Sequence, residues 1–253
     1  MPALHQLMSF FQKKIVLVGI PLFQLLFVTC LLTGFSAGVF AWGHEGHSTI
    51  GVMAVEQLHP DARHKLESIL GSIDTHEIIE ACNWPDAVSK TGEWDWSEPL
   101  HYINLPENET RYSKSRDCPD QLCATEAIKQ YANILGNQTE KTQQGWQAFA
   151  WLCHLTGDLH QPLHASFAHD RGGNNLKVVF RSKPSDLHDV WDHDLIESRV
   201  EDWKGLIELL RKYPVVEAGD NWTAGMVNDW TDESHQLVVE VVYPQSLEIS
   251  RDY

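Results

Sequence analysis

Basic residues are scarce in this chain. Its 253 residues include 19 Lys and Arg against 35 Asp and Glu, which gives a formal net charge of −16 at pH 7. Proteins that bind nucleic acid through a basic surface use Lys and Arg to displace counterions from the phosphates. The composition argues against such a surface, so a phosphate-bearing substrate would have to be held by some other cationic group. Bound metal ions are the obvious candidate.

Acidic residues are absent from the first 41 positions. This segment contains Lys13 and Lys14, followed by a long uncharged stretch with small residues at its end, up to Ala41. That pattern is typical of a secretory signal. We therefore expect residues 1–41 to be a signal peptide and 42–253 to form the mature domain of a secreted or periplasmic protein. Because the apolar stretch is long, the alternative is an uncleaved anchor, and only then would the protein be attached to a membrane.

Cysteine is also sparse, and one of the 5 residues, Cys30, lies in the predicted signal. In an exported protein, Cys118 and Cys123 in the segment DCPDQLC favour a local disulfide. Cys82 and Cys153 are compatible with buried free thiols or with a mutual disulfide. Three N-glycosylation sequons agree with export if the host glycosylates, at Asn108, Asn137 and Asn221.

No internal repeat or low-complexity tract is visible after the predicted signal. Apolar residues recur at helical spacing in several segments, the first of which Pro60 divides into two short helices. The segment EWDWSEPLHYINLP predicts a loop with an extended element, and DRGGNNLKVVF predicts a Gly-Gly turn and a hairpin. We expect an all-α fold, a single mainly helical domain with a short β-hairpin. The predicted helical segments are 48–70, 125–135, 144–159, 186–200 and 203–213, the last closed by Pro214.

Histidine is the abundant exception, with 14 residues in the chain. His154 and Asp158 are four residues apart, so a helix places both on one face, where a nitrogen and an oxygen ligand can reach one cation. His188 and Asp192 repeat this spacing. One such pair is more often part of a solvated helix face, but two pairs in a His-rich exported protein favour a metal site.

Three further residues join this group. Pro162 should end or kink the helix that carries His154, so that His164 approaches the same cavity from another direction. Asp86 in CNWPDAVSK and His101 in EPLHYINLP each lie beside Pro and aromatic residues. A carboxylate in such surroundings is costly unless it is paired or bound to a metal. Taken alone, each is equally compatible with a capping Asp or a hydrogen-bonded core His.

With these motifs together, the chain resembles the S1/P1 family of zinc-dependent nucleases over nearly all of the region from Trp42 to Trp230. The order and spacing of five motifs agree. They are a Trp followed five residues later by a His (Trp42, His47), W-P-D (Asp86), P-L-H-Y-I-N (His101), H-x-x-G-D-x-H-Q-P-L-H (His154, Asp158, His164) and L-H-x-V-W-D (His188, Asp192).

The resemblance implies three zinc ions per chain. One would be bound by Asp86, His101, His154 and Asp158, the second by His164, His188 and Asp192, and the third by the Trp42 backbone, His47 and Asp158. In this family the mature chain begins at the Trp, whose α-amino group and carbonyl oxygen are ligands. Cleavage after Ala41 would therefore complete the third site. Asp86 and Asp158 are the implied catalytic carboxylates, the first orienting the hydroxide that attacks phosphorus and the second bridging two zinc ions.

The implied reaction is endonucleolytic hydrolysis of single-stranded DNA and RNA to 5′-nucleotides, with 3′-nucleotides as further substrates and no stable protein partner. The resemblance implies that Tyr102 stacks on a base and Asn104 reads a base edge. Asn174 and Asn175 would contact phosphate. The residues alone are equally compatible with a core Tyr and a plain hairpin turn.

Two alternatives remain from the sequence. Zinc-dependent phospholipase C shares the fold and the N-terminal Trp, although the spacing of Trp42 and His47 favours the nuclease. A zinc-binding protein without turnover would keep every ligand. Family members generally continue past the segment VVYPQSLEISRDY with another long helix, so we expect this chain to lack the C-terminal helix of the family.

Overall fold

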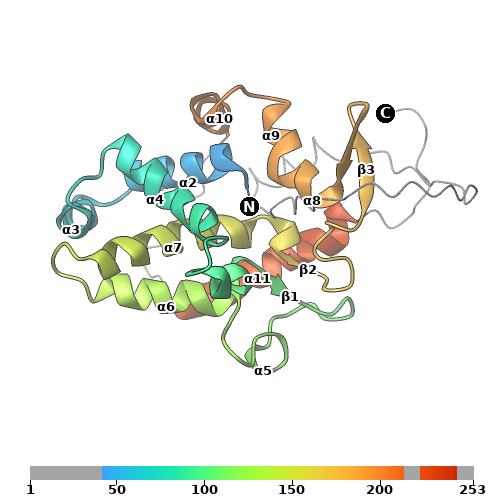
Figure 1. Cartoon of the computed structure of the whole chain (residues 1–253), viewed down its shortest axis with the longest axis horizontal. Helices are drawn as coiled ribbons and strands as arrows, with labels where there is room; N and C mark the ends of the chain where they lie inside the picture. Colours follow the sequence, from blue (N-terminus) through green and yellow to red (C-terminus); the bar gives the residue numbers. More distant parts are fainter. Residues whose placement is uncertain (1–41, 214–222, 244–253) are drawn as a thin grey trace, which may run out of the picture.

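The computed structural model describes residues 42–213 and 223–243. The predicted signal peptide, Asn221 and the end of the predicted domain lie outside these residues. The described part is mostly helical, with two small two-stranded sheets (Figure 1). This confirms the predicted all-α class with a short β-hairpin. None of the described helices is long and apolar enough to span a bilayer.

The first three helices are α2 (His44–Glu56), α3 (Pro60–Leu70) and α4 (Thr75–Val88). The predicted break at Pro60 is confirmed, because this residue occupies the first turn of α3, where its missing N–H costs nothing. Asp74 caps α4 by accepting a hydrogen bond from the Glu77 amide at 2.9 Å.

Helix α7 (Gln143–His160) is the centre of the domain and matches the predicted segment 144–159. It packs against α2, α4 and α6 (Ala124–Gly136), which matches the predicted segment 125–135. Figure 1 shows α7 between α4 and α6. Trp151, Leu155 and Leu159 are fully buried along this helix, so its packing fixes the position of its polar residues as well. The helix ends just before Pro162, as predicted.

The remaining helical elements are mostly short. They are the 3-10 helices η1 (Asp95–His101) and η2 (Pro162–His164), the α-helices α5 (Lys114–Asp117), α8 (Leu187–Asp189), α9 (Leu195–Glu197), α10 (Trp203–Leu210) and α11 (Ala224–Leu237), and the π-helical turns η3 (Val190–Asp194) and η4 (Val238–Val242). Helix α11, which packs on α6 and α7, was not predicted from the sequence.

The predicted hairpin is present, but its turn is not at the two glycines. Strands β3 (Lys177–Phe180) and β4 (Lys183–Asp186) pair antiparallel, with Phe180 opposite Lys183. The two connecting residues, Arg181 and Ser182, have φ of 45° and 67°. A two-residue loop with both φ values positive normally uses Asn or Gly, so the turn carries no sequence signal. The Gly-Gly pair forms a separate turn before β3.

A parallel strand pair connects two distant parts of the chain. Strand β1 (Ile103–Asn104) pairs with β2 (Ala165–Ser166), Ile103 opposite Ala165 and Asn104 opposite Ser166. Because β1 follows His101 and β2 follows His164, the pair fixes these two His residues relative to each other.

Both predicted cysteine pairs are close enough to bond. The Cys118–Cys123 disulfide is formed as predicted, with a Cα–Cα distance of 6.0 Å. Cys82 and Cys153 also form a disulfide, with a Cα–Cα distance of 5.3 Å, which decides between the two alternatives from the sequence. This second bond joins α4 to α7 covalently.

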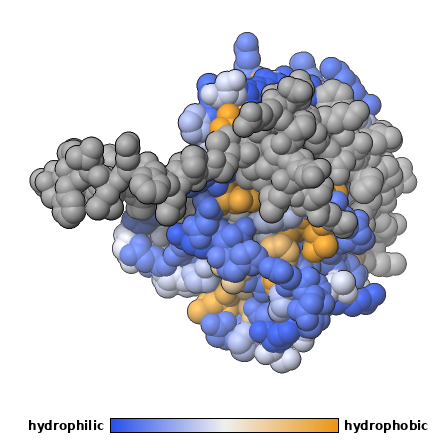
Figure 2. All heavy atoms as spheres, turned by 90° about the vertical axis from the view of Figure 1, so that its right-hand side faces the viewer, coloured by the Kyte–Doolittle hydropathy of each residue, from blue (hydrophilic) through white to orange (hydrophobic). Residues whose placement is uncertain are grey.

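Apolar side chains are mostly inside the domain. Among the described residues, the large hydrophobic side chains classed as exposed are Trp96, Leu122 and Val239. On the face shown in Figure 2, the described surface is largely hydrophilic and its apolar residues form separate patches.

Candidate metal centre

Four predicted ligands converge at the contact between α4, η1 and α7. Nδ1 of His101 lies 3.0 Å from Oδ2 of Asp158 and 3.0 Å from Nε2 of His154. Oδ1 of Asp86 lies 3.3 Å from the same His154 nitrogen and 3.7 Å from His101 Nδ1. Zinc bonds of about 2.0–2.2 Å imply tetrahedral ligand atoms about 3.3–3.6 Å apart. The observed separations of 3.0–3.7 Å lie on both sides of this range, and His101, His154 and Asp158 form one of the groups whose ligand atoms could hold a metal ion.

Three residues of a second set meet beside the first. The ligand atoms of His164, His188 and Asp192 all lie within 4.8 Å of one another, and the three residues are buried. Nε2 of His188 is 3.1 Å from Oδ2 of Asp192, the contact that the spacing of four residues predicts. Asp192 lies in the π-helical turn η3, a type of turn that is frequent at functional sites.

Backbone carbonyls orient the histidine rings. Nδ1 of His154 is 2.9 Å from the carbonyl oxygen of Cys82, and Nδ1 of His188 is 2.7 Å from that of Gly172. Nδ1 of His164 is 2.6 Å from the carbonyl oxygen of His101. A carbonyl only accepts, so each Nδ1 carries a proton, and in the neutral ring each Nε2 has a lone pair for a cation. Nε2 of His164 is buried and has no hydrogen-bond partner among the described residues, as expected of a metal ligand.

Asp158 presents its two carboxylate oxygens to different groups. Oδ2 faces His101, while Oδ1 lies 3.3 Å from Nε2 of His47. The rings of His47 and His154 are stacked, with centroids 3.9 Å apart. His47, Asp86 and His154 also form a group with the spacing of metal ligands. The two oxygens of this carboxylate therefore face different histidines, and its bridging role stays a prediction.

The first described residues of the chain are held near the second set. Gly43 donates its amide hydrogen to the carbonyl oxygen of Asp192 at 2.9 Å. A Cβ at Gly43 would lie 2.3 Å from the His193 ring, so a larger residue here would require that ring to move. Trp42, which directly precedes Gly43, is half-buried. The metal-binding role of its α-amino group stays a prediction. His44 is exposed and lies outside the ligand groups.

Burial and charge act in opposite directions on the pKa values of the cluster. Burial lowers the pKa of His154, but the carboxylates of Asp158 and Asp86 outweigh it and raise the pKa to about 9. His188 behaves in the same way, because Asp192 counters its burial and raises its pKa to about 9. The pKa of Asp158 is well below its usual range despite burial, because His154 and other His residues surround it. In the metal-free protein, protonated His154 and His188 therefore balance the charge of the neighbouring carboxylates. A cation that binds to these residues must displace the protons.

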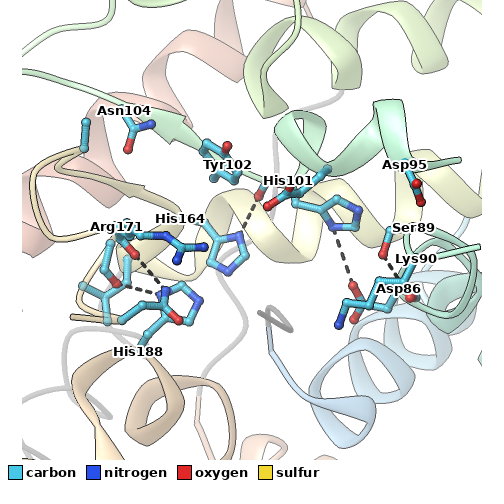
Figure 3. Close-up of a pocket in the computed structure, with 15 residues that line it drawn as sticks. Asp86, Ser89, Lys90, Asp95, His101, Tyr102, Asn104, His164, Arg171 and His188 are labelled. Carbon is cyan, nitrogen blue, oxygen red and sulfur yellow. Dashed lines mark hydrogen bonds and ion pairs between the residues drawn. The ribbon is translucent and has the colours of Figure 1, made fainter. Parts of the chain in front are cut away.

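A cavity of about 650 Å³ opens onto the two sets (Figure 3). Asp86, His101, His164 and His188 form part of its wall. Three predicted substrate residues, Tyr102, Asn104 and Asn174, also line it, whereas Asn175 does not. Figure 3 shows Tyr102 and Asn104 together on one side of the cavity.

Sequence reasoning missed three charged residues of the cavity wall, namely Asp95, Glu98 and Arg171. Asp95, Glu98 and His101 follow one another at intervals of three on η1, and residues three apart share one face of a 3-10 helix. A 3-10 interpretation of this segment would have placed both acidic residues beside His101. Arg171 carries no comparable signal.

Comparison with known proteins gives one consistent result. The family model for S1/P1 Nuclease matches residues 42–253. Endonuclease 3 of Arabidopsis thaliana is 35% identical over 176 residues, which cover 68% of this chain and 60% of that protein. Nuclease P1 of Penicillium citrinum is 27% identical over 223 residues, covering 80% and 82% of the two chains. Nuclease S1 of Aspergillus oryzae is 25% identical over 240 residues, covering 85% and 83%. The chain thus spans about 60% of the length of the Arabidopsis protein.

Proposed function

Because this chain belongs to the S1/P1 nuclease family, we propose that it is a zinc-dependent endonuclease. Its substrates are single-stranded DNA and RNA, which it hydrolyses to 5′-nucleotides, and 3′-nucleotides are further substrates. The observation that carries the proposal is the convergence of ligand atoms from Asp86, His101, His154 and Asp158 beside a cavity of about 650 Å³. Nitrogen and carboxylate ligands favour zinc over magnesium or calcium, which prefer oxygen ligands.

The proposed number of zinc ions is three. His164, His188 and Asp192 would hold the second ion, and the Trp42 backbone, His47 and Asp158 the third. The two differently directed oxygens of Asp158 support its role as the bridge between the first and third ions. Bound zinc would supply positive charge for the phosphate and lower the pKa of a water molecule towards 7.

The protein residues position the reacting groups. The side chain of Asp158 is fully buried, whereas that of Asp86 is 13% exposed and lines the cavity. Asp86 can therefore accept a hydrogen bond from the attacking water and orient it towards phosphorus. The carbonyl contacts of the His rings fix the ligand nitrogens in place before substrate arrives, so no reorganisation accompanies the reaction.

Substrate recognition is proposed for the side of the cavity opposite Asp86. Tyr102 offers an aromatic ring on which any unstacked base can lie, which favours single strands. Asn104 lies two residues further on, in β1, and its amide can form hydrogen bonds to a base edge. Asn174 is the better placed of the two asparagines for phosphate, because it lines the cavity and Asn175 does not.

We also propose that the protein is exported, with 1–41 as its signal peptide. Two disulfides support an oxidising compartment, because such bonds are rare where thiols are kept reduced. Cleavage after Ala41 would then free the α-amino group of Trp42 as a ligand. The proposal connects export to activity, because the uncleaved chain lacks that ligand.

The test measures zinc content and hydrolysis on protein that begins at Trp42. We expect about three zinc ions per chain and release of 5′-nucleotides from single-stranded DNA, both abolished by a chelator. Phosphatidylcholine is offered in parallel, and its preferential hydrolysis would establish the phospholipase alternative instead. Zinc binding without turnover of either substrate would mean a zinc-binding protein. No bound zinc would refute the metal assignment.

A further inference from the structure

Arg171 has a backbone conformation that normally belongs to glycine. Its φ is 57°, and Gly172 and Gly173 follow with 62° and 85°. For Gly172 the absence of a side chain is necessary, because a Cβ would lie 2.5 Å from the carbonyl oxygen of Leu163. Arg171 has a Cβ and still adopts the left-handed conformation, which costs free energy. Residues with a strained backbone cluster at functional sites, so we expect the Arg171 side chain to have a functional role that offsets this cost.

The turn around Arg171 is fixed to the metal ligands. The Gly172 carbonyl accepts the hydrogen bond from Nδ1 of His188 at 2.7 Å, and the Arg171 carbonyl accepts one from Nδ2 of Asn174 at 2.7 Å. The Gly172 amide donates to the Phe167 carbonyl at 3.0 Å. The same turn therefore positions the His188 ring and the Arg171 side chain, and it holds both against the cavity.

The exposed Arg171 side chain lines the cavity, where burial raises the pKa of the Tyr102 hydroxyl and the positive charge of Arg171 opposes this rise. The hydrogen bonds of Arg171 to other described residues are made by its backbone. Figure 3 shows it extending towards His164, on the side of the cavity away from Asp86. Lys90, the other basic residue of the wall, lies near Asp86 and Asp95 instead. A guanidinium in this position, beside a cluster of metal ligands, can bind an anion.

We propose that Arg171 binds non-bridging oxygens of the phosphate group that the metal centre holds. This inference rests on the proposed nuclease function and assigns to it a specific phosphate-binding residue. The planar guanidinium matches two phosphate oxygens at once, which a Lys cannot do. In a chain with a net charge of −16, it also supplies positive charge where few basic residues are available. The strained backbone at Arg171 thus lowers the stability of the fold, while its side chain increases the affinity for substrate.

The test uses substitutions to glycine, which keep the left-handed backbone and remove the guanidinium. Arg171→Gly is compared with Arg181→Gly, a matched control because Arg181 has a φ of 45° in the β3–β4 turn and is absent from the cavity wall. Arg171→Lys retains the charge alone. The zinc-loaded proteins are assayed for kcat and KM on single-stranded DNA and for thermal stability. Their affinity is measured over a range of salt concentrations towards an oligothymidylate whose 3′ bridging oxygens are replaced by methylene groups, which blocks cleavage and keeps both non-bridging oxygens.

We expect Arg171→Gly to lower kcat/KM and oligothymidylate affinity by about 10- to 100-fold, the range for a charge-assisted hydrogen bond. Its logarithmic salt slope should fall by about 0.7, the value for one phosphate contact on a single strand. Its melting temperature should be equal to or above that of the wild type. Arg171→Lys should lie between wild type and the Gly variant, and Arg181→Gly should have wild-type kinetics and salt slope.

Wild-type affinity and salt slope in Arg171→Gly would overturn the inference, and so would a loss of stability large enough to explain a loss of activity. Failure of the proposed function has a different signature. In that case the wild type binds the oligothymidylate or inorganic phosphate without hydrolysing single-stranded DNA. A reduced salt slope in Arg171→Gly would then still support Arg171 as the phosphate-binding residue.

Discussion

The disulfide between Cys82 and Cys153 should stabilise the domain far more than the one between Cys118 and Cys123. The two bonds close loops with sequence separations of 71 and 5. Loop-closure entropy gives about 4 kcal/mol for the longer loop and about 2 kcal/mol for the shorter. Domains of this size are stable by about 5–15 kcal/mol, so loss of the longer bond removes a large share of the total.

The perturbation is the pair of double variants Cys82→Ala/Cys153→Ala and Cys118→Ala/Cys123→Ala. The free energy of unfolding is measured by denaturant titration of the metal-free proteins, because bound zinc would add a separate contribution. Cys82, Cys118 and Cys123 are all buried, so the change in packing is comparable in both variants. Equal losses, or a larger loss from the short loop, would refute the loop-closure reasoning.

A second measurement links this bond to the metal centre. Cys82 lies one helical turn before Asp86 on α4, and Cys153 directly precedes His154 on α7. Without the covalent link, the two helices can separate slightly, and the four ligand atoms move apart. We expect the Cys82→Ala/Cys153→Ala variant to bind its first zinc more weakly than the control variant does. Identical zinc affinities in the two variants would show that packing alone holds the helices in register.

Three further predictions concern the metal centre. Asp158→Ala should lose two of three zinc ions and nearly all activity, because its two oxygens face different proposed cation positions, whereas Asp189→Ala should retain all three by metal analysis. One extra residue before Trp42 should weaken zinc binding and lower kcat in a side-by-side assay, and full activity would exclude the α-amino ligand. His154 and His188, each with a pKa of about 9, are protonated at pH 7 in the metal-free protein, so calorimetry should detect about two protons released on zinc loading. Because both pKa values are raised, their contribution to metal-free stability is full below about pH 6.5 and is lost as pH rises through 9.

Local sequence patterns predicted the parts of the site that depend on local geometry. Because His154 and Asp158 are four residues apart, they lie on one face of α7 whatever that helix packs against. Pro162 ends the helix because proline has no backbone N–H to continue the hydrogen-bond pattern. The i, i+4 pair at His188 and Asp192 is likewise retained, although a π-helical turn begins between them. The assignment of these pairs to separate metal sites came from the resemblance to the nuclease family, which rests on the order of the motifs.

Features set by tertiary contacts were not accessible from the sequence. The β1–β2 pair has two residues per strand, too few for an alternating pattern to emerge. The β3–β4 turn uses Arg181 and Ser182 in place of the usual Asn or Gly. Arg171 reaches the cavity because the turn that follows it lies close to the Leu163 carbonyl and accepts a hydrogen bond from His188, contacts for which the sequence has no local pattern.

The β1–β2 pair also has a consequence for the order in which the metal centre is assembled during folding. His154 and Asp158 are brought together as soon as α7 forms, since helix formation needs only local contacts. His101 and His164 are 63 positions apart, and they are aligned only when β1 and β2 meet. If the proposed metal site is correct, full coordination requires that these long-range contacts have already formed, and partly folded chains would bind the metal weakly. Metal binding would then come late in folding and would stabilise only fully folded molecules against unfolding.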